Sequence, residues 1–189
     1  PAFDFFMAKG VAKSFRKHLS SFINFYVAME NGIQADEKAI RTLIKEYLPS
    51  IQSGERERET LRIALIALQI NIDKEHLARI IEKAYQQTRK DTHQAMEGFI
   101  HNLNTMHSRG GNQVVFSSIN YGTDTSAEGR MVIEELLKAT IEGLGTHGEV
   151  PVFPIQIFKV KDGVSYSEKD YEKAMKMESI EDCLLYTSD

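Results

Sequence analysis

A chain of 189 residues is long enough to bury a full-sized hydrophobic core, or to form one part of a larger domain. Its composition of 42% hydrophobic and 26% charged residues is ordinary for a soluble protein, and no stretch approaches the roughly 18 apolar residues of a membrane span. Twenty-three basic and 27 acidic residues give a net charge of -4, which excludes a polycationic surface for nucleic acid. We therefore expect a soluble protein that binds neither nucleic acid nor a membrane.

The ends of the chain and its cysteine content predict a cytoplasmic fragment. One cysteine excludes an internal disulfide, and no apolar signal segment opens the sequence. The opening PAFDFF lacks a methionine and reads as the interior of a structured region, so we interpret residues 1–182 as an internal fragment of one domain. The ending CLLYTSD resembles a translated sequencing adaptor. We expect residues 183–189 to be a non-native tail and Cys183 to have no chemical role.

Apolar residues at steps of three and four predict two helices in the first 50 residues. The first runs from about Val11 to Glu30 and stops at Asn31-Gly32. Its predicted buried stripe consists of Val11, Phe15, Leu19, Phe22, Tyr26 and Met29. Asp36 is the predicted N-cap of the second helix, which ends at Pro49. The charged SGERERE run that follows is expected at the surface.

A longer helix is predicted after a short apolar segment at residues 61–70. Asp73 can cap this helix, which runs to about Met106 with roughly 32 residues and a length of about 48 Å. This length favours a helix that crosses a surface or forms a dimer, and a break near Lys90-Asp91 is the alternative. Residues 1–108 are therefore expected to be mainly helical.

The hydrophobic period changes after residue 112. Gln113 to Tyr121 is β-prone, Thr125 to Glu128 fits a capping box, and Val152 to Val160 reads as a second strand. The helix between them is expected to end at Gly145 and to bury Ile133, Leu136, Leu137, Thr140, Ile141 and Leu144. Residues 113–160 therefore predict a parallel, right-handed strand–helix–strand unit, and the fold class is α/β with a helical first part.

The turn after Tyr121 is the candidate binding site, because ligands in parallel α/β sheets lie beyond the carboxyl ends of the strands. Neutral hydroxyl donors there can bind phosphate or ribose oxygens, and a glycine permits close backbone approach. The alternative is that the hydroxyls only cap and turn the chain. The candidate substrate-binding residues are Ser117, Ser118, Asn120, Gly122, Thr123 and Thr125.

Two other kinds of site are weighed and not favoured. His93, Glu97 and His101 are spaced four residues apart, which can build a metal site on a helix. The sequence shows no further carboxylate or cysteine cluster to complete it, so a solvated helix face is favoured and no metal is expected. Ser117 and Ser118 lack a GxSxG elbow, and we assign no catalytic residue.

Residues 94–109, QAMEGFIHNLNTMHSR, and residues 113–126, QVVFSSINYGTDTS, closely resemble the anaerobic (class III) ribonucleotide reductase family. The opening PAFDFFMAKGVAKSFRKH and residues 153–163, FPIQIFKVKDG, resemble it too, and the likeness weakens after residue 163. The resemblance implies a cytoplasmic glycyl-radical enzyme that reduces ribonucleoside triphosphates inside a ten-stranded α/β barrel. It also implies ATP and deoxynucleotide effectors, a formate or thiol reductant, and an activating enzyme that uses S-adenosylmethionine and an iron–sulfur cluster.

The sequence contains neither the radical-glycine motif nor the finger-loop cysteine motif of that family. The resemblance therefore implies that the fragment alone is inactive, binds no cofactor itself and has no residue with a radical role. The alternatives are a non-catalytic nucleotide-binding α/β module and another glycyl-radical enzyme. A longer reading frame that ends in a glycyl-radical motif would exclude the module.

The resemblance also implies an effector loop and a homodimer. In the wider superfamily, a loop between a dimer-interface helix and a barrel strand carries the identity of the bound effector to the active site. Its counterparts here are Arg109, Gly110, Gly111, Asn112 and Gln113, and an ordinary glycine helix stop is the alternative. We expect the first and the long helix to contribute to the dimer face, so that a charge at Ile81 or Ala84 weakens dimerisation.

Overall fold

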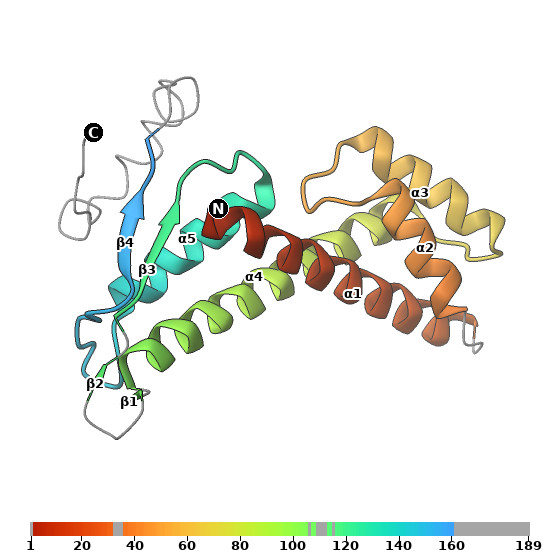
Figure 1. Cartoon of the computed structure of the whole chain (residues 1–189). Helices are drawn as coiled ribbons and strands as arrows, with labels where there is room; N and C mark the ends of the chain where they lie inside the picture. Colours follow the sequence, from red (N-terminus) through yellow and green to blue (C-terminus); the bar gives the residue numbers. More distant parts are fainter. Residues whose placement is uncertain (1, 32–35, 106, 109–112, 115, 161–189) are drawn as a thin grey trace. The chain divides into compact units, whose positions relative to one another are not determined.

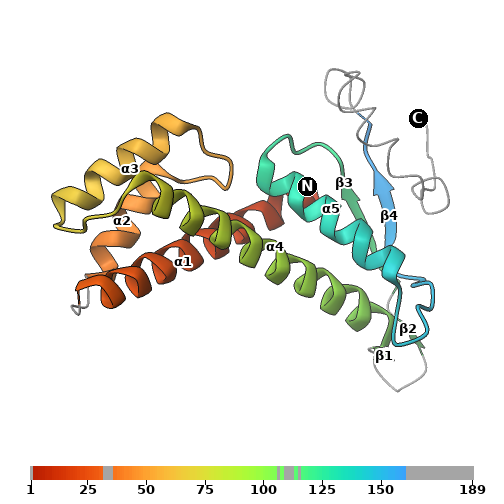
Figure 2. The same cartoon turned by 180° about the vertical axis from the view of Figure 1, so that it is seen from behind.

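The computed structural model describes residues 2–31, 36–105, 107–108, 113–114 and 116–160 (Figures 1 and 2). The chain divides into two compact units, which we call the helical unit (residues 9–91) and the mixed unit (residues 1–8 together with residues from 92 onward). Helices α1 (Phe3–Asn31) and α4 (Lys74–Thr105) each contribute residues to both units. No helix within the described ranges combines the length and apolar character that a membrane crossing requires.

The helical unit also contains α2 (Glu37–Tyr47) and α3 (Glu55–Ala67), which pack against each other. Asp36 caps α2 as predicted, since its Oδ1 accepts the amide of Lys38 at 2.9 Å. Asp73 caps α4 in the same way, with its Oδ1 2.7 Å from the amide nitrogen of His76. The SGERERE run is largely exposed, as expected, but it also begins α3, a helix that was not predicted from the sequence.

The buried stripe of α1 differs from the predicted one. It consists of Val11, Phe15, Leu19, Ile23 and Val27, a series of steps of four. Met29 was predicted to be buried and is 72% exposed. Steps of four form a ridge that slopes across the helix surface, whereas the predicted stripe mixed steps of three and four to stay parallel to the axis.

The mixed unit contains the parallel strand–helix–strand arrangement that the sequence predicted. Strand β3 (Ser118–Tyr121) pairs in parallel with β4 (Ile155–Phe158), in the register Ser118 to Ile155 and Tyr121 to Phe158. Helix α5 (Ala127–Glu142) lies between them in the chain and covers one face of the pair (Figures 1 and 2). The α/β class is confirmed for this unit.

The predicted boundaries of the two strands were wrong. Within 113–121 only Ser118–Tyr121 belongs to the parallel pair, because β2 (Gln113–Val114) pairs antiparallel with β1 (His107–Ser108) in a separate sheet. The second predicted strand, residues 152–160, shortens to β4. Its start after Pro154 has a physical reason, because proline has no amide hydrogen for a strand ladder.

The ends of α5 also differ from the prediction. Ser126, and not Thr125, is the N-cap, since its Oγ accepts the amide of Gly129 at 3.0 Å. At the other end Gly143, and not Gly145, follows the helix, with φ of 77°. Ile141, predicted in the buried stripe, is 48% exposed.

A buried chain of hydrogen bonds joins the two strands to α5. The Tyr121 hydroxyl donates to Gln156 Oε1 at 2.9 Å, and Gln156 Nε2 donates to Thr140 Oγ1 at 2.8 Å. Gln156 therefore occupies the face of β4 that α5 covers, and the neighbouring Ile155 and Ile157 occupy the opposite face.

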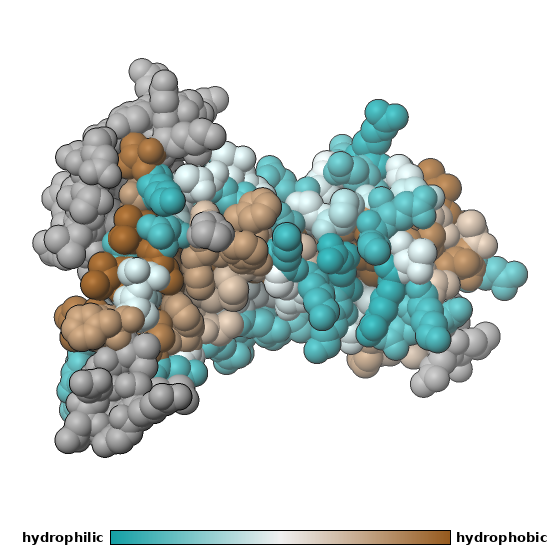
Figure 3. All heavy atoms as spheres, in the orientation of Figure 1, coloured by the Kyte–Doolittle hydropathy of each residue, from teal (hydrophilic) through white to brown (hydrophobic). Residues whose placement is uncertain are grey.

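Exposed apolar side chains gather around the β3–β4 pair (Figure 3). They are Phe116, Val150, Val152, Ile155 and Val160. An isolated two-stranded sheet is marginally stable in water, and a concentration of exposed apolar side chains typically marks a contact surface.

Candidate functional site

The turn after β3 is held by a carboxylate from the start of α1. Asp4 is fully buried, and its Oδ2 accepts the amides of Gly122 at 2.9 Å and of Asp124 at 3.1 Å. Its Oδ1 accepts the amide of Phe5 at 3.0 Å. These two turn amides, which could otherwise bind a phosphate, are therefore already hydrogen-bonded within the chain.

Gly122 is required by the packing of the chain itself. Its φ is 108°, and an added Cβ would lie 2.8 Å from a ring carbon of Phe158 and 2.9 Å from the carbonyl oxygen of Lys159. We predicted that this glycine permits close approach of backbone to a ligand. The close approach observed is to the end of β4.

The candidate substrate-binding residues fall into two groups along β3. Gly122, Thr123 and Thr125 lie in the turn at its carboxyl end, with Thr123 half-buried and Thr125 exposed. Ser117 and Ser118 lie at its amino end. Ser118 and Gly122 are four positions apart along the strand, a distance of about 13 Å. One phosphate group therefore cannot contact both groups.

Asn120 and Ser118 share the face of β3 that is turned away from α5. Side chains alternate along a strand, and the intervening Ile119 and Tyr121 are buried beneath the helix. Asn120 is half-buried and Ser118 is exposed, beside Ile157 and Ile155 of the paired strand. This face thus presents two polar side chains among apolar ones.

Arg109, Gly110, Gly111 and Asn112 of the predicted effector loop lie outside the described residues. Gln113 begins β2, where its backbone is paired with that of Ser108.

A cluster of a histidine and three carboxylates joins α4 to α5. His93 Nδ1 lies 3.0 Å from Glu135 Oε2, and His93 Nε2 lies 3.0 Å from Glu142 Oε2 and 3.8 Å from Glu97 Oε1. Glu135 is buried and also accepts from Lys138 at 3.2 Å. Burial of Lys138 lowers the pKa of its ammonium, but hydrogen bonds to Glu134 and Glu135 outweigh this effect and raise the pKa.

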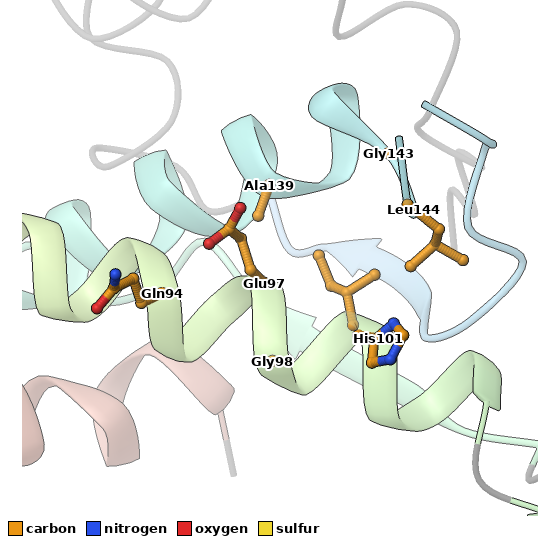
Figure 4. A pocket seen from close by; sticks show the side chains of 9 residues that line it. Gln94, Glu97, Gly98, His101, Ala139, Gly143 and Leu144 are labelled. Carbon is orange, nitrogen blue, oxygen red and sulfur yellow. The ribbon is translucent and has the colours of Figure 1, made fainter. Parts of the chain in front are cut away.

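A pocket of about 440 Å³ adjoins this cluster. Figure 4 shows Glu97 and His101 rising from α4 toward Ala139 and Leu144. His101, which the sequence analysis paired with His93 and Glu97, lines the pocket, and the cluster is completed by residues of α5 instead.

Two groups of residues at the candidate sites were not predicted from the sequence. Asp4 lies in the quoted opening PAFDFF, but nothing local connects it to a turn 118 positions away. Glu135 and Glu142 lie 42 and 49 positions from His93. A carboxylate in an otherwise apolar segment, like Asp4, is the one signal that could have indicated a buried partner.

The mixed unit belongs to the class of α/β proteins in which a strand, a glycine turn and a helix N-terminus meet at the carboxyl edge of a parallel sheet. A family model described as anaerobic ribonucleoside-triphosphate reductase matches residues 1–183, and the chain belongs to this family.

Two curated relatives have the same description. The anaerobic ribonucleoside-triphosphate reductase of Enterobacteria phage T4 is 32% identical over 109 residues, which are 58% of this chain and 18% of the relative. That of Escherichia coli (strain K12) is 31% identical over 98 residues, or 52% of this chain and 14% of the relative. The chain thus spans less than a fifth of the length of these relatives.

Proposed function

We propose that this chain is part of an enzyme that reduces ribonucleoside triphosphates to deoxyribonucleoside triphosphates under anaerobic conditions. The observation that carries the proposal is the family match over residues 1–183, together with relatives named for this activity. The proposed enzyme uses a glycyl radical that lies outside this chain and is installed by an activating enzyme with S-adenosylmethionine and an iron–sulfur cluster. The chain alone is expected to be inactive.

The β3–β4 pair is proposed to be two strands of a ten-stranded α/β barrel. The exposed apolar residues around the pair support this, because neighbouring strands and the barrel interior would bury them. In such a barrel the helices lie outside, so the face turned away from α5 is the interior face. Ser118 and Asn120 are then interior residues near the reaction site.

We infer that Asn120 and Thr123 contact the nucleoside part of the substrate and not its triphosphate. Asp4 and Asp124 place two carboxylates at the turn. A triphosphate carries about four negative charges, so these carboxylates would repel it. Neutral amide and hydroxyl groups match ribose hydroxyls and base edges. Within the described part of the chain, the hydroxyls of Thr123 and Thr125 make no hydrogen bond that would occupy them.

The test uses the full-length protein, activated anaerobically, with nucleotide reduction and radical content measured separately. Asn120→Ala and Thr123→Ala are each expected to raise KM for the nucleotide roughly two- to tenfold, the range that loss of one neutral hydrogen bond gives. Thr60→Ala is the control, since that hydroxyl bonds to the Arg56 carbonyl oxygen at an exposed position of α3.

Each outcome of this test has a distinct meaning. Unchanged KM in both variants would refute the binding role. A loss of the glycyl radical signal in electron paramagnetic resonance would make the turn a folding element. Failure of the activated wild-type protein to form deoxynucleotide would refute the activity itself.

We also propose that the protein is a homodimer that binds ATP or a deoxynucleotide effector, with residues 109–113 as the loop that responds to it. Ile81 and Ala84, the positions through which we first expected the helices to dimerise, are buried within the chain, which does not support a place for them in the dimer face. The exposed apolar residues of this unit are the better candidates. They include Phe25, Met29, Ile63 and Ile66.

A further inference from the structure

The His93 cluster contains an unfavourable contact that a cation at Nε2 would relieve. Both ring nitrogens of His93 lie 3.0 Å from carboxylate oxygens. Ionised carboxylates only accept hydrogen bonds, and a neutral imidazole has one N–H and one lone pair. A neutral His93 that donates from Nδ1 to Glu135 would therefore direct its Nε2 lone pair at the lone pairs of Glu142.

Two cations can occupy this position, a second proton or a metal ion. The environment of Nε2 favours the metal ion, because Glu97 also approaches it and gives three ligand atoms that lie within 4.8 Å of one another. Ligands at 2.0–2.2 Å from a tetrahedral ion are about 3.4 Å apart. The observed separations of 3.0 and 3.8 Å from Nε2 to the two carboxylates bracket that value.

Glu135 is placed as the outer partner of a metal-binding histidine. A histidine that binds a metal commonly donates its other N–H to a carboxylate, which fixes the tautomer and the ring orientation. The Glu135 side chain is 4% exposed, so its position is set by packing within the mixed unit. It leaves Nε2 as the nitrogen available to an ion.

The end of α5 gives an independent reason for a cation at this point. Glu142 is the last residue of α5, and no basic residue stands in the last turn. Carbonyl groups make the C-terminal end of a helix partly negative, so a carboxylate there is unfavourable and a cation is favourable. A bound ion next to Glu142 would reverse that unfavourable interaction.

We propose that His93 Nε2, Glu97 and Glu142 form a binding site for a divalent first-row transition-metal ion such as Zn²⁺, with Glu135 orienting the imidazole. The ion would link α4 to the C-terminal end of α5 and leave coordination positions open to water. An imidazole ligand disfavours Mg²⁺ and Ca²⁺, which prefer oxygen ligands only. No metal was expected here because the sequence shows no further carboxylate cluster near His93 and Glu97, but the fold supplies Glu142 from another helix.

The test measures metal binding by the full-length protein and does not depend on the proposed reductase activity. The protein is freed of metal with a chelator and titrated with Zn²⁺ by calorimetry, and bound zinc is counted after dialysis. His93→Gln is expected to bind one zinc ion fewer per chain than the wild type. Glu135→Gln is expected to weaken this site by about 10- to 100-fold, the range typical of an outer partner of a metal-binding histidine. Glu142→Gln removes a charged ligand and is expected to weaken it by at least about as much.

Glu82→Gln is the matched control, because Glu82 is an exposed residue of α4 outside the cluster. It should bind as much zinc as the wild type. Glu142 is 57% exposed, so Glu142→Gln should fold even if His93→Gln does not, and circular dichroism checks both. Equal zinc content and affinity in the wild type, Glu142→Gln and Glu135→Gln would overturn the proposal.

Discussion

The Oδ2 atom of Asp4 lies 2.9 Å from the amide nitrogen of Gly122, and this hydrogen bond joins residues 118 positions apart. The same oxygen accepts the Asp124 amide, so one buried carboxylate holds both sides of the turn between β3 and α5. The first residues of the chain thereby determine the shape of the candidate binding turn.

Replacing Asp4 by asparagine should loosen this turn. Both carboxylate oxygens accept backbone amides, and asparagine would direct an NH₂ group at one of them. We expect a local cost of about 1–3 kcal/mol, the penalty for a buried donor left without an acceptor. Hydrogen exchange of peptides covering residues 121–130 in the full-length protein measures it. Asp36→Asn is the control, since asparagine is as good an N-cap as aspartate, and equally slow exchange in both variants would contradict the prediction.

Gly122→Ala should destabilise the mixed unit, whereas Gly10→Ala should not. The first change places a Cβ on a residue with φ of 108°, 2.8 Å from the Phe158 ring. We therefore expect the free energy of unfolding to fall by about 1–3 kcal/mol. Gly10 lies inside α1 with no atom within 4 Å of an added Cβ, where alanine should add up to about 1 kcal/mol through helix propensity. Denaturant unfolding compares the two, and equal midpoints would refute the argument.

The observed N-cap of α5 predicts different effects for two adjacent hydroxyl residues. Ser126→Ala should cost about 1 kcal/mol, because it removes the acceptor of the Gly129 amide. Thr125→Ala should leave the helix unchanged. Thermal unfolding and exchange at the start of α5 separate them. A larger effect from Thr125 would support the capping box that we first predicted.

The His18–Asp91 pair should stabilise the helical unit in a pH-dependent way. Burial raises the pKa of Asp91, but hydrogen bonds from His18 and Gln87 outweigh burial and lower it. A depressed folded-state pKa gives stability that is present above the ordinary value of about 3.9 and is lost as the pH falls through the folded-state pKa. Asp91→Asn should thus unfold more readily than the wild type near neutral pH, and the difference should disappear in acid. A difference that is constant with pH would rule out this linkage.

Dimerisation should depend on exposed residues of the helical unit. Phe25 is 66% exposed on α1, so Phe25→Glu adds a charge without opening the core. We expect it to shift the full-length protein toward monomer in sedimentation. Lys13→Glu is the control, because it changes charge at another exposed position of α1 that offers no apolar ring. An unaffected dimer would place the interface elsewhere.

Local features of the sequence predicted local features of the fold. Asp36 and Asp73 were correctly assigned as caps because an N-cap bonds to amides two or three positions away. Thr125 and Ser126 could not be distinguished, since either hydroxyl can cap. The partners of His93 and of Gly122 depend on which helices and turns meet in space, and no periodicity of the chain encodes that.

The hydrogen-bond chain from Tyr121 through Gln156 to Thr140 has a consequence for changes in chain length. A slip of β4 by one residue would bring Ile155 or Ile157 under α5 and leave the Tyr121 and Thr140 hydroxyls without Gln156. The segment between residues 143 and 154 can therefore change in length only if Gln156 still forms its hydrogen bonds to Tyr121 and Thr140. Homologues and engineered variants should differ in the length of this segment, while the residue at the position of Gln156 continues to face α5.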